Sequence, residues 1–262
     1  MNALIDVHTH LGQFSTHAMS ADGERLCALL RQADIAHAVT FSIEACHGAL
    51  DLGNRYTLDQ VARHDMLSAM VVAHPLHLHA SRRWVAEAGS NANIVGVKLH
   101  PVLGNYDIRS AAMNRLIEEV VAPAGLTVLS HVGNESANAP IASYLELARK
   151  FPSVRFIAAH LGIGVMGLAG AAIDAWREGL CGNVWFDMGT LRAFCNGAVV
   201  DLLEAVGPDR ICFGTDAPLY IPAPFTRLLE CLPIGDDARE KIAWRNALAS
   251  IPALGGRPGV PS

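Results

Sequence analysis

Short apolar runs rich in β-branched residues recur along the whole 262-residue chain, and this repeat limits the possible folds more than any other feature. Successive runs begin roughly 27 to 34 residues apart, the length of one strand, one helix and two short loops. Each run is expected to form a strand. The eight runs are Ala3–Val7, His37–Ile43, Leu67–Ala73, Ile94–Leu99, Leu126–Ser130, Val154–Ala159, Val184–Asp187 and Ile211–Phe213.

Helical patterns fill the intervals between these runs. Eight strands that alternate with helices predict an α/β fold, a single-domain (β/α)8 TIM barrel over residues 1–251 with a Pro/Gly-rich surface tail over 252–262. An open doubly wound sheet would carry a glycine-rich fingerprint after its first strand, and none is present. The expected helices are Asp22–Ala33, Thr57–His64, Met113–Val121, Ile141–Phe151 and Val199–Val206, with weaker patterns at Ala80–Ala88 and Ala169–Glu178.

The amino-acid composition limits the kinds of molecule that the protein is expected to bind. A net charge of −5 and an aromatic content of 6% argue against a nucleic-acid groove, so a small-molecule substrate is expected instead. Glycines and His160 interrupt the uncharged stretch Phe156–Ile173, so we expect no membrane span. Six scattered cysteines and the lack of a basic leader predict a cytoplasmic protein. The small residues of Gly162–Ala172 would allow close packing in a homo-oligomer.

Ionisable side chains end nearly every predicted strand. The active site of a barrel is built from the C-terminal ends of its strands, so these side chains should converge on one mouth. Strand-end residues are more often Ser, Thr, Asn or Gly, which makes the pattern informative. The residues concerned are His8, His10, His74, Lys98, His100, His131, His160, Asp187 and Asp216.

The pair His8 and His10 is the sharpest signal among them. Residues i and i+2 of a strand face the same side, so both imidazoles could bind one cation. A pair of core or surface histidines is the simpler alternative. His131, His160 and Asp216 share one pattern, a polar residue that ends an apolar strand with glycine close by. Their convergence on one mouth is hard to explain as packing, because buried histidines need partners for both ring nitrogens.

Lys98 is one of three lysines and alone lies inside an apolar strand. It could pair with a carboxylate, bind an anionic substrate group, or be carboxylated by carbon dioxide and bridge two metal ions. A lysine that snorkels to the barrel rim is a further alternative. His100 has the same strand parity, so we predict that both side chains face the mouth and contact the substrate. His74, His77 and His79 are expected to be loop or rim residues.

Several motifs together are specific for one known family. They are Ile5–His10, Gly96–Pro101, Ala148–Pro152 with Ala159–Gly162, Gly207–Ile211 with Phe213–Asp216, and Asn246–Leu248. With these motifs the chain resembles the amidohydrolase superfamily, and within it the amidohydrolase-2 branch of metal-dependent barrel hydrolases, lactonases and non-oxidative decarboxylases. The chain is shorter than those decarboxylases usually are, and Ala243–Arg245 departs from the glycine-rich closing motif.

The resemblance implies a set of ligands. His8, His10 and Asp216 would bind a divalent metal, and His131 would be a further ligand. His160 would position a metal-bound water or bind a second ion, with Lys98 as a carboxylated bridge in the two-ion case. Zinc is the expected metal, with manganese, iron or cobalt as alternatives because such sites accept several ions.

The resulting first hypothesis is hydrolysis of a small-molecule amide, ester or lactone by a metal-activated water, with Asp216 as proton acceptor and His160 beside the water. The alternative is a non-oxidative decarboxylase of a small carboxylic acid. That reaction needs a clamp for the substrate carboxylate, for which Arg192 is the candidate, although Arg192 could equally be a surface helix residue. A metal-free lactonase and a barrel that binds without turnover are two further hypotheses.

Overall fold

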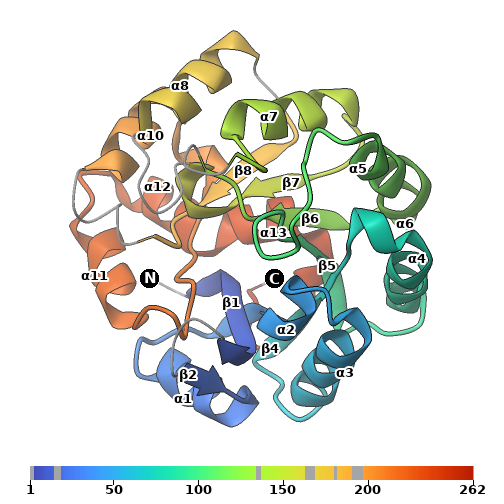
Figure 1. The fold of residues 1–262 in the computed structure, drawn as a ribbon. Helices are drawn as coiled ribbons and strands as arrows, with labels where there is room; N and C mark the ends of the chain where they lie inside the picture. Colours follow the sequence, from blue (N-terminus) through green and yellow to red (C-terminus); the bar gives the residue numbers. More distant parts are fainter. Residues whose placement is uncertain are drawn as a thin grey trace.

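The computed structural model describes residues 3–14, 19–133, 137–162, 169–179, 182–190 and 197–261. Parallel strands form a curled sheet in the middle of the molecule, surrounded by helices (Figure 1). The sheet also holds one antiparallel edge strand, β2 (Met19–Ala21). The predicted single-domain (β/α)8 architecture is confirmed. The parallel strands, in spatial order, are β1 (Ile5–Phe14), β3 (His37–Ser42), β4 (Leu67–Val72), β5 (Ile94–Leu99), β6 (Thr127–Ser130), β7 (Phe156–Ala158), β8 (Val184–Asp187) and β9 (Ile211–Cys212).

The barrel closes between β1 and the segment that begins at the end of β9. Val7 N donates to the carbonyl of Phe213 at 3.1 Å, and Asp216 N donates to the carbonyl of His8 at 2.8 Å. His10 N donates in turn to the carbonyl of Ala217 at 2.7 Å. Because β9 itself is only two residues long, these three bonds form the seam. They bring Asp216 next to the two histidines of β1.

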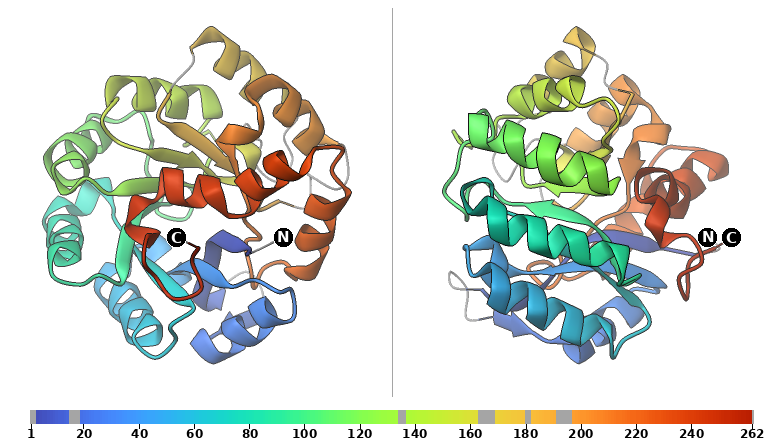
Figure 2. Two further views of the ribbon diagram at one scale, coloured as in Figure 1. Left: turned by 180° about the vertical axis from the view of Figure 1, so that it is seen from behind. Right: turned by 90° about the vertical axis from the view of Figure 1, so that its right-hand side faces the viewer.

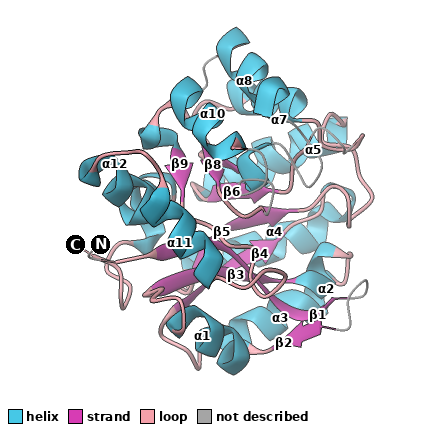
Figure 3. Cartoon of the chain, turned by 90° about the vertical axis from the view of Figure 1, so that its left-hand side faces the viewer, coloured by secondary structure: helices cyan, strands magenta, loops and turns pink. Residues whose placement is uncertain are grey.

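Helices pack around the outside of the strands (Figure 3). Two π-helical turns, Ile117–Val121 and Lys241–Arg245, continue helices rather than end them. No helix in the described ranges is both long and apolar enough to cross a membrane. The helices are α1 (Gly23–Arg31), α2 (Ile43–Cys46), α3 (Leu50–Val61), α4 (Leu78–Ala86), α5 (Ala111–Leu116), α6 (Ala122–Ala124), α7 (Ile141–Lys150), α8 (Ala169–Glu178), α10 (Ala198–Val206), α11 (Ala223–Cys231), α12 (Asp236–Glu240) and α13 (Asn246–Ser250).

The core follows from this arrangement. Strands β3 to β9 are buried along their whole length, because one side faces the barrel interior and the other faces the helices. Phe41, Phe156, Phe186 and Phe213 are among the largest fully buried side chains. Such a rigid core lets side chains at the strand ends be held in fixed positions.

Two element boundaries differ most from the sequence-based expectation. The first strand was expected over Ala3–Val7, but β1 continues to Phe14, so His8 and His10 lie inside the strand and not at its end. Its far end, beyond the barrel, pairs with the short strand β2 as an antiparallel hairpin. Helix α3 begins at Leu50, earlier than the expected Thr57. In β1, pairing with β2 extends the strand beyond its apolar pattern.

The C-terminal tail docks at the N-terminal end of the barrel. Leu254 is buried, and the carbonyl of Pro258 accepts a hydrogen bond from His37 Nδ1 at 2.9 Å. Arg257 Nη2 donates to Asn93 Oδ1 at 2.5 Å. Both His37 and Asn93 lie at the starts of barrel strands, so the tail covers the end opposite the mouth, where both termini lie (Figure 2).

Candidate metal centre

His8, His10 and Asp216 form a compact buried group. His8 and His10 share one face of β1, and the barrel seam brings Asp216 against them. His10 Nε2 lies 2.8 Å from Asp216 Oδ1, and His8 Nε2 lies 3.4 Å from the same oxygen. One donor atom from each residue lies within 4.8 Å of the others. The structure therefore brings together the three residues that the sequence singled out first.

The chemistry of this group fits a divalent metal ion. Imidazole nitrogens and a carboxylate oxygen are ligands that zinc, manganese and similar ions accept. Nδ1 of His10 is buried and has no hydrogen-bond partner among the described residues. Because Nε2 of the same ring faces Asp216, either nitrogen of His10 remains able to act as a ligand, and the convergence of buried donors within 4.8 Å is the observation that fits an ion.

Asp187, the last residue of β8, belongs to the same cluster. Its Oδ2 lies 2.9 Å from His8 Nδ1. Its Oδ1 accepts hydrogen bonds from the main-chain nitrogens of His160, at 3.0 Å, and Gly189, at 2.9 Å. With His8 and His160 it forms a second group of compact donors. The strand-end pattern in the sequence includes Asp187 but assigns it no role, although its position at a strand end is the available signal.

His131 and His160 meet at the ends of β6 and β7. Nδ1 of His131 lies 3.1 Å from Nε2 of His160, and Nδ1 of His160 lies against the carbonyl of Gly189. A carbonyl only accepts, so Nδ1 of His160 carries a proton and donates it to Gly189, and Nε2 of His160 faces Nδ1 of His131. His160 and Leu161 both have left-handed backbones, with φ of 59° and 57°. This uncommon turn aims the His160 ring across the mouth.

Lys98 reaches the same cluster from β5. Its Nζ lies 3.1 Å from His8 Nε2 and 4.3 Å from the centre of the Phe41 ring. The side chain is fully buried, so it does not snorkel to the rim. Among the described residues no carboxylate lies within salt-bridge distance of it. The buried ammonium contacts His8 and the Phe41 ring, and the charges of Asp187 and Asp216 act on it from farther away.

Burial sets the protonation of the cluster. It raises the pKa of Asp216 to about 7, although His160 and Lys98 oppose the shift. It lowers the pKa of Lys98 to about 8 and holds those of His8 and His10 well below their ordinary value. The histidines are therefore neutral at pH 7, and neutral imidazole is the form that binds metal ions.

Asp6 supports the donors from behind. Its Oδ1 accepts from His8 N at 3.0 Å and from Thr215 N at 3.1 Å, and its Oδ2 accepts from Thr215 Oγ1 at 2.5 Å. Burial raises its pKa to about 7. One carboxyl group thus ties the strand that carries both histidines to the residue that precedes Asp216.

The remaining candidate residues from the sequence do not belong to the two compact donor groups. His100 stacks on His131 with ring centres 4.4 Å apart and is nearly buried. Nε2 of His74 pairs with the carbonyl of Gly104, in agreement with a loop contact and not a ligand. Arg192, the expected carboxylate clamp, lies outside the described residues.

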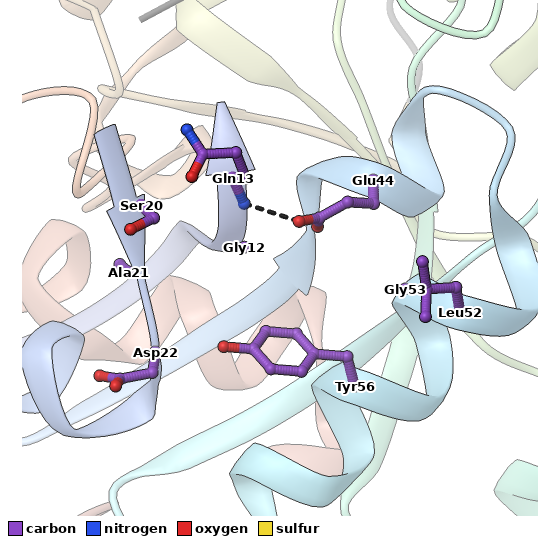
Figure 4. Close-up of a pocket in the computed structure, with 9 residues that line it drawn as sticks. All are labelled: Gly12, Gln13, Ser20, Ala21, Asp22, Glu44, Leu52, Gly53 and Tyr56. Carbon is purple, nitrogen blue, oxygen red and sulfur yellow. Dashed lines mark hydrogen bonds between the residues drawn. The ribbon is translucent and has the colours of Figure 1, made fainter. Parts of the chain in front are cut away.

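A cavity of about 360 Å³ lies between the β1–β2 hairpin and helices α2 and α3 (Figure 4). Its Glu44 carboxylate accepts from Gln13 N at 2.6 Å and from Ser42 Oγ at 2.7 Å, which fixes the hairpin against α2. None of the candidate ligands lines this cavity. Gly12 does, and it follows His10 by two residues on β1.

Comparison with known proteins settles the family. A family model described as amidohydrolase matches residues 5–250, nearly the whole chain. The chain belongs to the amidohydrolase family. No curated protein matches this amidohydrolase in a sequence search.

Solved structures share the fold of this amidohydrolase at low sequence identity. The 2,6-dihydroxybenzoate decarboxylase from Rhizobium is 14% identical, with a TM-score of 0.74 over 97% of this chain and 100% of its own. The 5-carboxyvanillate decarboxylase from Novosphingobium aromaticivorans, complexed with manganese and a nitrobenzoic acid, is 12% identical, with a TM-score of 0.73 over 95% and 96%. A probable 2-pyrone-4,6-dicarboxylic acid hydrolase from Acinetobacter baumannii, with citric acid bound, is 13% identical, with a TM-score of 0.71 over 96% and 100%.

Proposed function

We propose that this amidohydrolase acts on a small carboxylic acid with the help of a divalent metal ion, and that the reaction is a non-oxidative decarboxylation. The observation that carries the proposal is the buried ammonium of Lys98 beside the metal-binding group. An ionised side chain in a protein interior is stable only when a counter-charge or several hydrogen bonds compensate it. A substrate carboxylate would supply that counter-charge at the mouth.

The same observation favours an acidic substrate over a neutral amide or ester. Lys98 has no ion-pair partner in the described part of the chain, and the flat rings of Phe41 and His10 pack together next to it. A carboxylate on an unsaturated ring or chain matches both the charge and the shape of these neighbours.

The residues can perform a decarboxylation in a balanced step. His8, His10 and Asp216 would hold the metal. When bound, a divalent ion would supply a Lewis acid that binds substrate oxygens and stabilises negative charge. Lys98 binds and orients the carboxylate that leaves as carbon dioxide. As the carbon–carbon bond breaks, its electron pair stays on the substrate carbon. The carboxylate of Asp216 would first take a proton from water or from a substrate hydroxyl and would then pass it to that carbon.

The comparisons support this order of hypotheses, which reverses the one from the sequence. Several of the solved structures with the same fold are decarboxylases of aromatic acids, and two of them are described with manganese. We therefore propose manganese as a physiological candidate beside the expected zinc.

Hydrolysis remains the second candidate because one relative in fold is a probable hydrolase of a pyrone dicarboxylic acid. Its named substrate also carries carboxylates, so Lys98 could serve either reaction. The test is to load the protein with manganese or zinc and to offer hydroxybenzoates and pyrone carboxylates while carbon dioxide and ring-opened products are measured separately. Metal-dependent carbon dioxide release that Asp216→Asn abolishes is expected. Ring-opened product without carbon dioxide would replace the lyase by the hydrolase.

A further inference from the structure

We propose that Asp187 is a positioning residue that fixes the tautomer of His8 and thereby presents Nε2 of His8 to the metal ion. This inference rests on the proposed metal site but not on the reaction that follows. Asp187 lies at the end of β8, on the strand next to β9, and is fully buried.

The hydrogen bonds around His8 agree on a single tautomer. Oδ2 of Asp187 accepts from Nδ1 of His8 across 2.9 Å, so the ring proton lies on Nδ1. On the other side of the ring, the Lys98 ammonium has only donors and lies 3.1 Å from Nε2. Nε2 therefore keeps its lone pair, as a metal ligand must.

The second oxygen of Asp187 organises His160. Oδ1 accepts from the main-chain nitrogens of both His160 and Gly189, and the carbonyl of Gly189 accepts in turn from Nδ1 of His160. The left-handed turn at His160 is thus held by the same carboxylate that orients His8. Two rings that reach the mouth from different strands owe their orientation to the end of β8.

These contacts also distinguish Asp187 from a ligand. Three donors already engage its two oxygens, and none of its atoms is exposed. If His8 donates from Nδ1 to Asp187, the group of His8, His160 and Asp187 is a hydrogen-bonded network and not a second ion site. Partners of this kind are known to change metal affinity about 10- to 100-fold when removed.

The decisive variant is Asp187→Asn, which keeps the shape of the side chain. Its amide oxygen can still accept from His160 N and Gly189 N, but its NH2 group would face Nδ1 of His8. A donor would then face each ring nitrogen of His8, the new side-chain amide at Nδ1 and the Lys98 ammonium at Nε2, so the proton would no longer be fixed on Nδ1. Two measurements follow: the His8 tautomer from 15N–1H correlation spectra of the metal-free protein, and Mn²⁺ affinity from the paramagnetic resonance signal of free Mn²⁺. We expect a measurable population of the Nε2–H tautomer and an affinity about 10- to 100-fold weaker.

Asp6→Asn is the matched control, because Asp6 is equally buried and bonds His8 only through the main chain. It should lower thermal stability and leave the His8 tautomer unchanged. Wild-type tautomer and wild-type Mn²⁺ affinity in Asp187→Asn would overturn the proposal. If that variant does not fold, the wild-type spectrum still decides, since an Nε2–H signal for His8 in the metal-free protein would overturn it. None of these outcomes depends on whether the enzyme is a lyase or a hydrolase.

Discussion

Nζ of Lys98 lies 3.1 Å from Nε2 of His8, deep inside the barrel where neither side chain reaches solvent. The ammonium therefore donates to the very nitrogen that would face a metal ion. The Lys98 ammonium and a metal ion cannot both use the single lone pair of His8 Nε2. Metal binding should therefore free the Lys98 ammonium to contact the substrate. Its charge would then be available to a carboxylate in the mouth.

Lys98→Met should weaken substrate binding and leave metal binding intact or stronger. A hydrogen bond to a charged group contributes about 1.5–3 kcal/mol, so KM for a carboxylate substrate should rise about 10- to 150-fold. Mn²⁺ affinity should not fall, because a neighbouring positive charge is removed. Lys150→Met, at an exposed lysine bonded to Asn114, is the control. Loss of bound metal in Lys98→Met would instead indicate a carboxylated lysine that bridges ions.

Mn²⁺ affinity should increase with pH up to about 7 and then level off. The pKa of Asp216 in the metal-free fold is about 7, and a ligand must lose its proton before it binds. Below that pH, each unit should weaken binding about tenfold, since one proton competes with the ion. Calorimetric titrations in two buffers with different ionisation enthalpies count that proton. An affinity that is constant from pH 5.5 to 7 (about the range in which one carboxyl would titrate) would contradict it.

The raised pKa of Asp216 also makes the stability of the metal-free fold depend on pH. The pKa of Asp216 rises from 3.8 to about 7 on folding, so the metal-free native state binds the proton more tightly than the unfolded chain does. The contribution of Asp216 to stability is full below pH 3.8 and is lost as the pH rises to about 7. Relative to Asp216→Asn, the metal-free wild type should therefore lose stability across that window, as urea titrations would show. A difference that does not vary with pH would exclude this shift.

Elemental analysis after loading and desalting should find one metal ion per chain. Both compact donor groups use His8, and Nδ1 of His8 is engaged by Asp187. Chelator-treated protein that has been reloaded with manganese or zinc provides the comparison. A ratio of two ions per chain would show that Asp187 changes partner and that the second group also binds metal.

Gly12→Ala should destabilise the protein by about 1–3 kcal/mol. Gly12 has φ of +97°, and a Cβ there would lie 1.9 Å from Glu44 Oε2, so both backbone and carboxylate would have to move. Gly89→Ala is the control, because Gly89 is exposed and a Cβ there meets no atom. Thermal unfolding of the two variants measures the difference, and equal melting temperatures would show that the hairpin tolerates the change.

Much of the barrel could be predicted because each strand is a compact apolar run, and buried parallel strands leave that signal in sequence. Strand β2 left none, since three residues paired on a hairpin need no pattern of their own. The predicted length of β1 was wrong for the same reason. Its far half is defined by its partner and not by its composition.

Some residues of the candidate site could likewise be predicted from the sequence, and others could not. His8, His10 and Asp216 could be found because each ends or alternates within an apolar strand, and the barrel topology makes such positions converge. The role of Asp187 could not be predicted from the sequence, because it depends on which ring nitrogen of His8 faces the carboxylate. The pairing of His131 with His160 depends on a left-handed turn that no local sequence signal announces.

The proposed metal site lies at the seam where the barrel closes, so a bound ion would help to hold the barrel shut. His10 and Asp216 are 206 residues apart in the chain, and they meet where three main-chain hydrogen bonds join the first strand to the segment after the last. An ion held by both would act as a removable cross-link between the first strand of the barrel and the segment after its last strand. Stripping it with a chelator should loosen the joint first, so amide exchange should quicken in β1 and β9 before it does elsewhere.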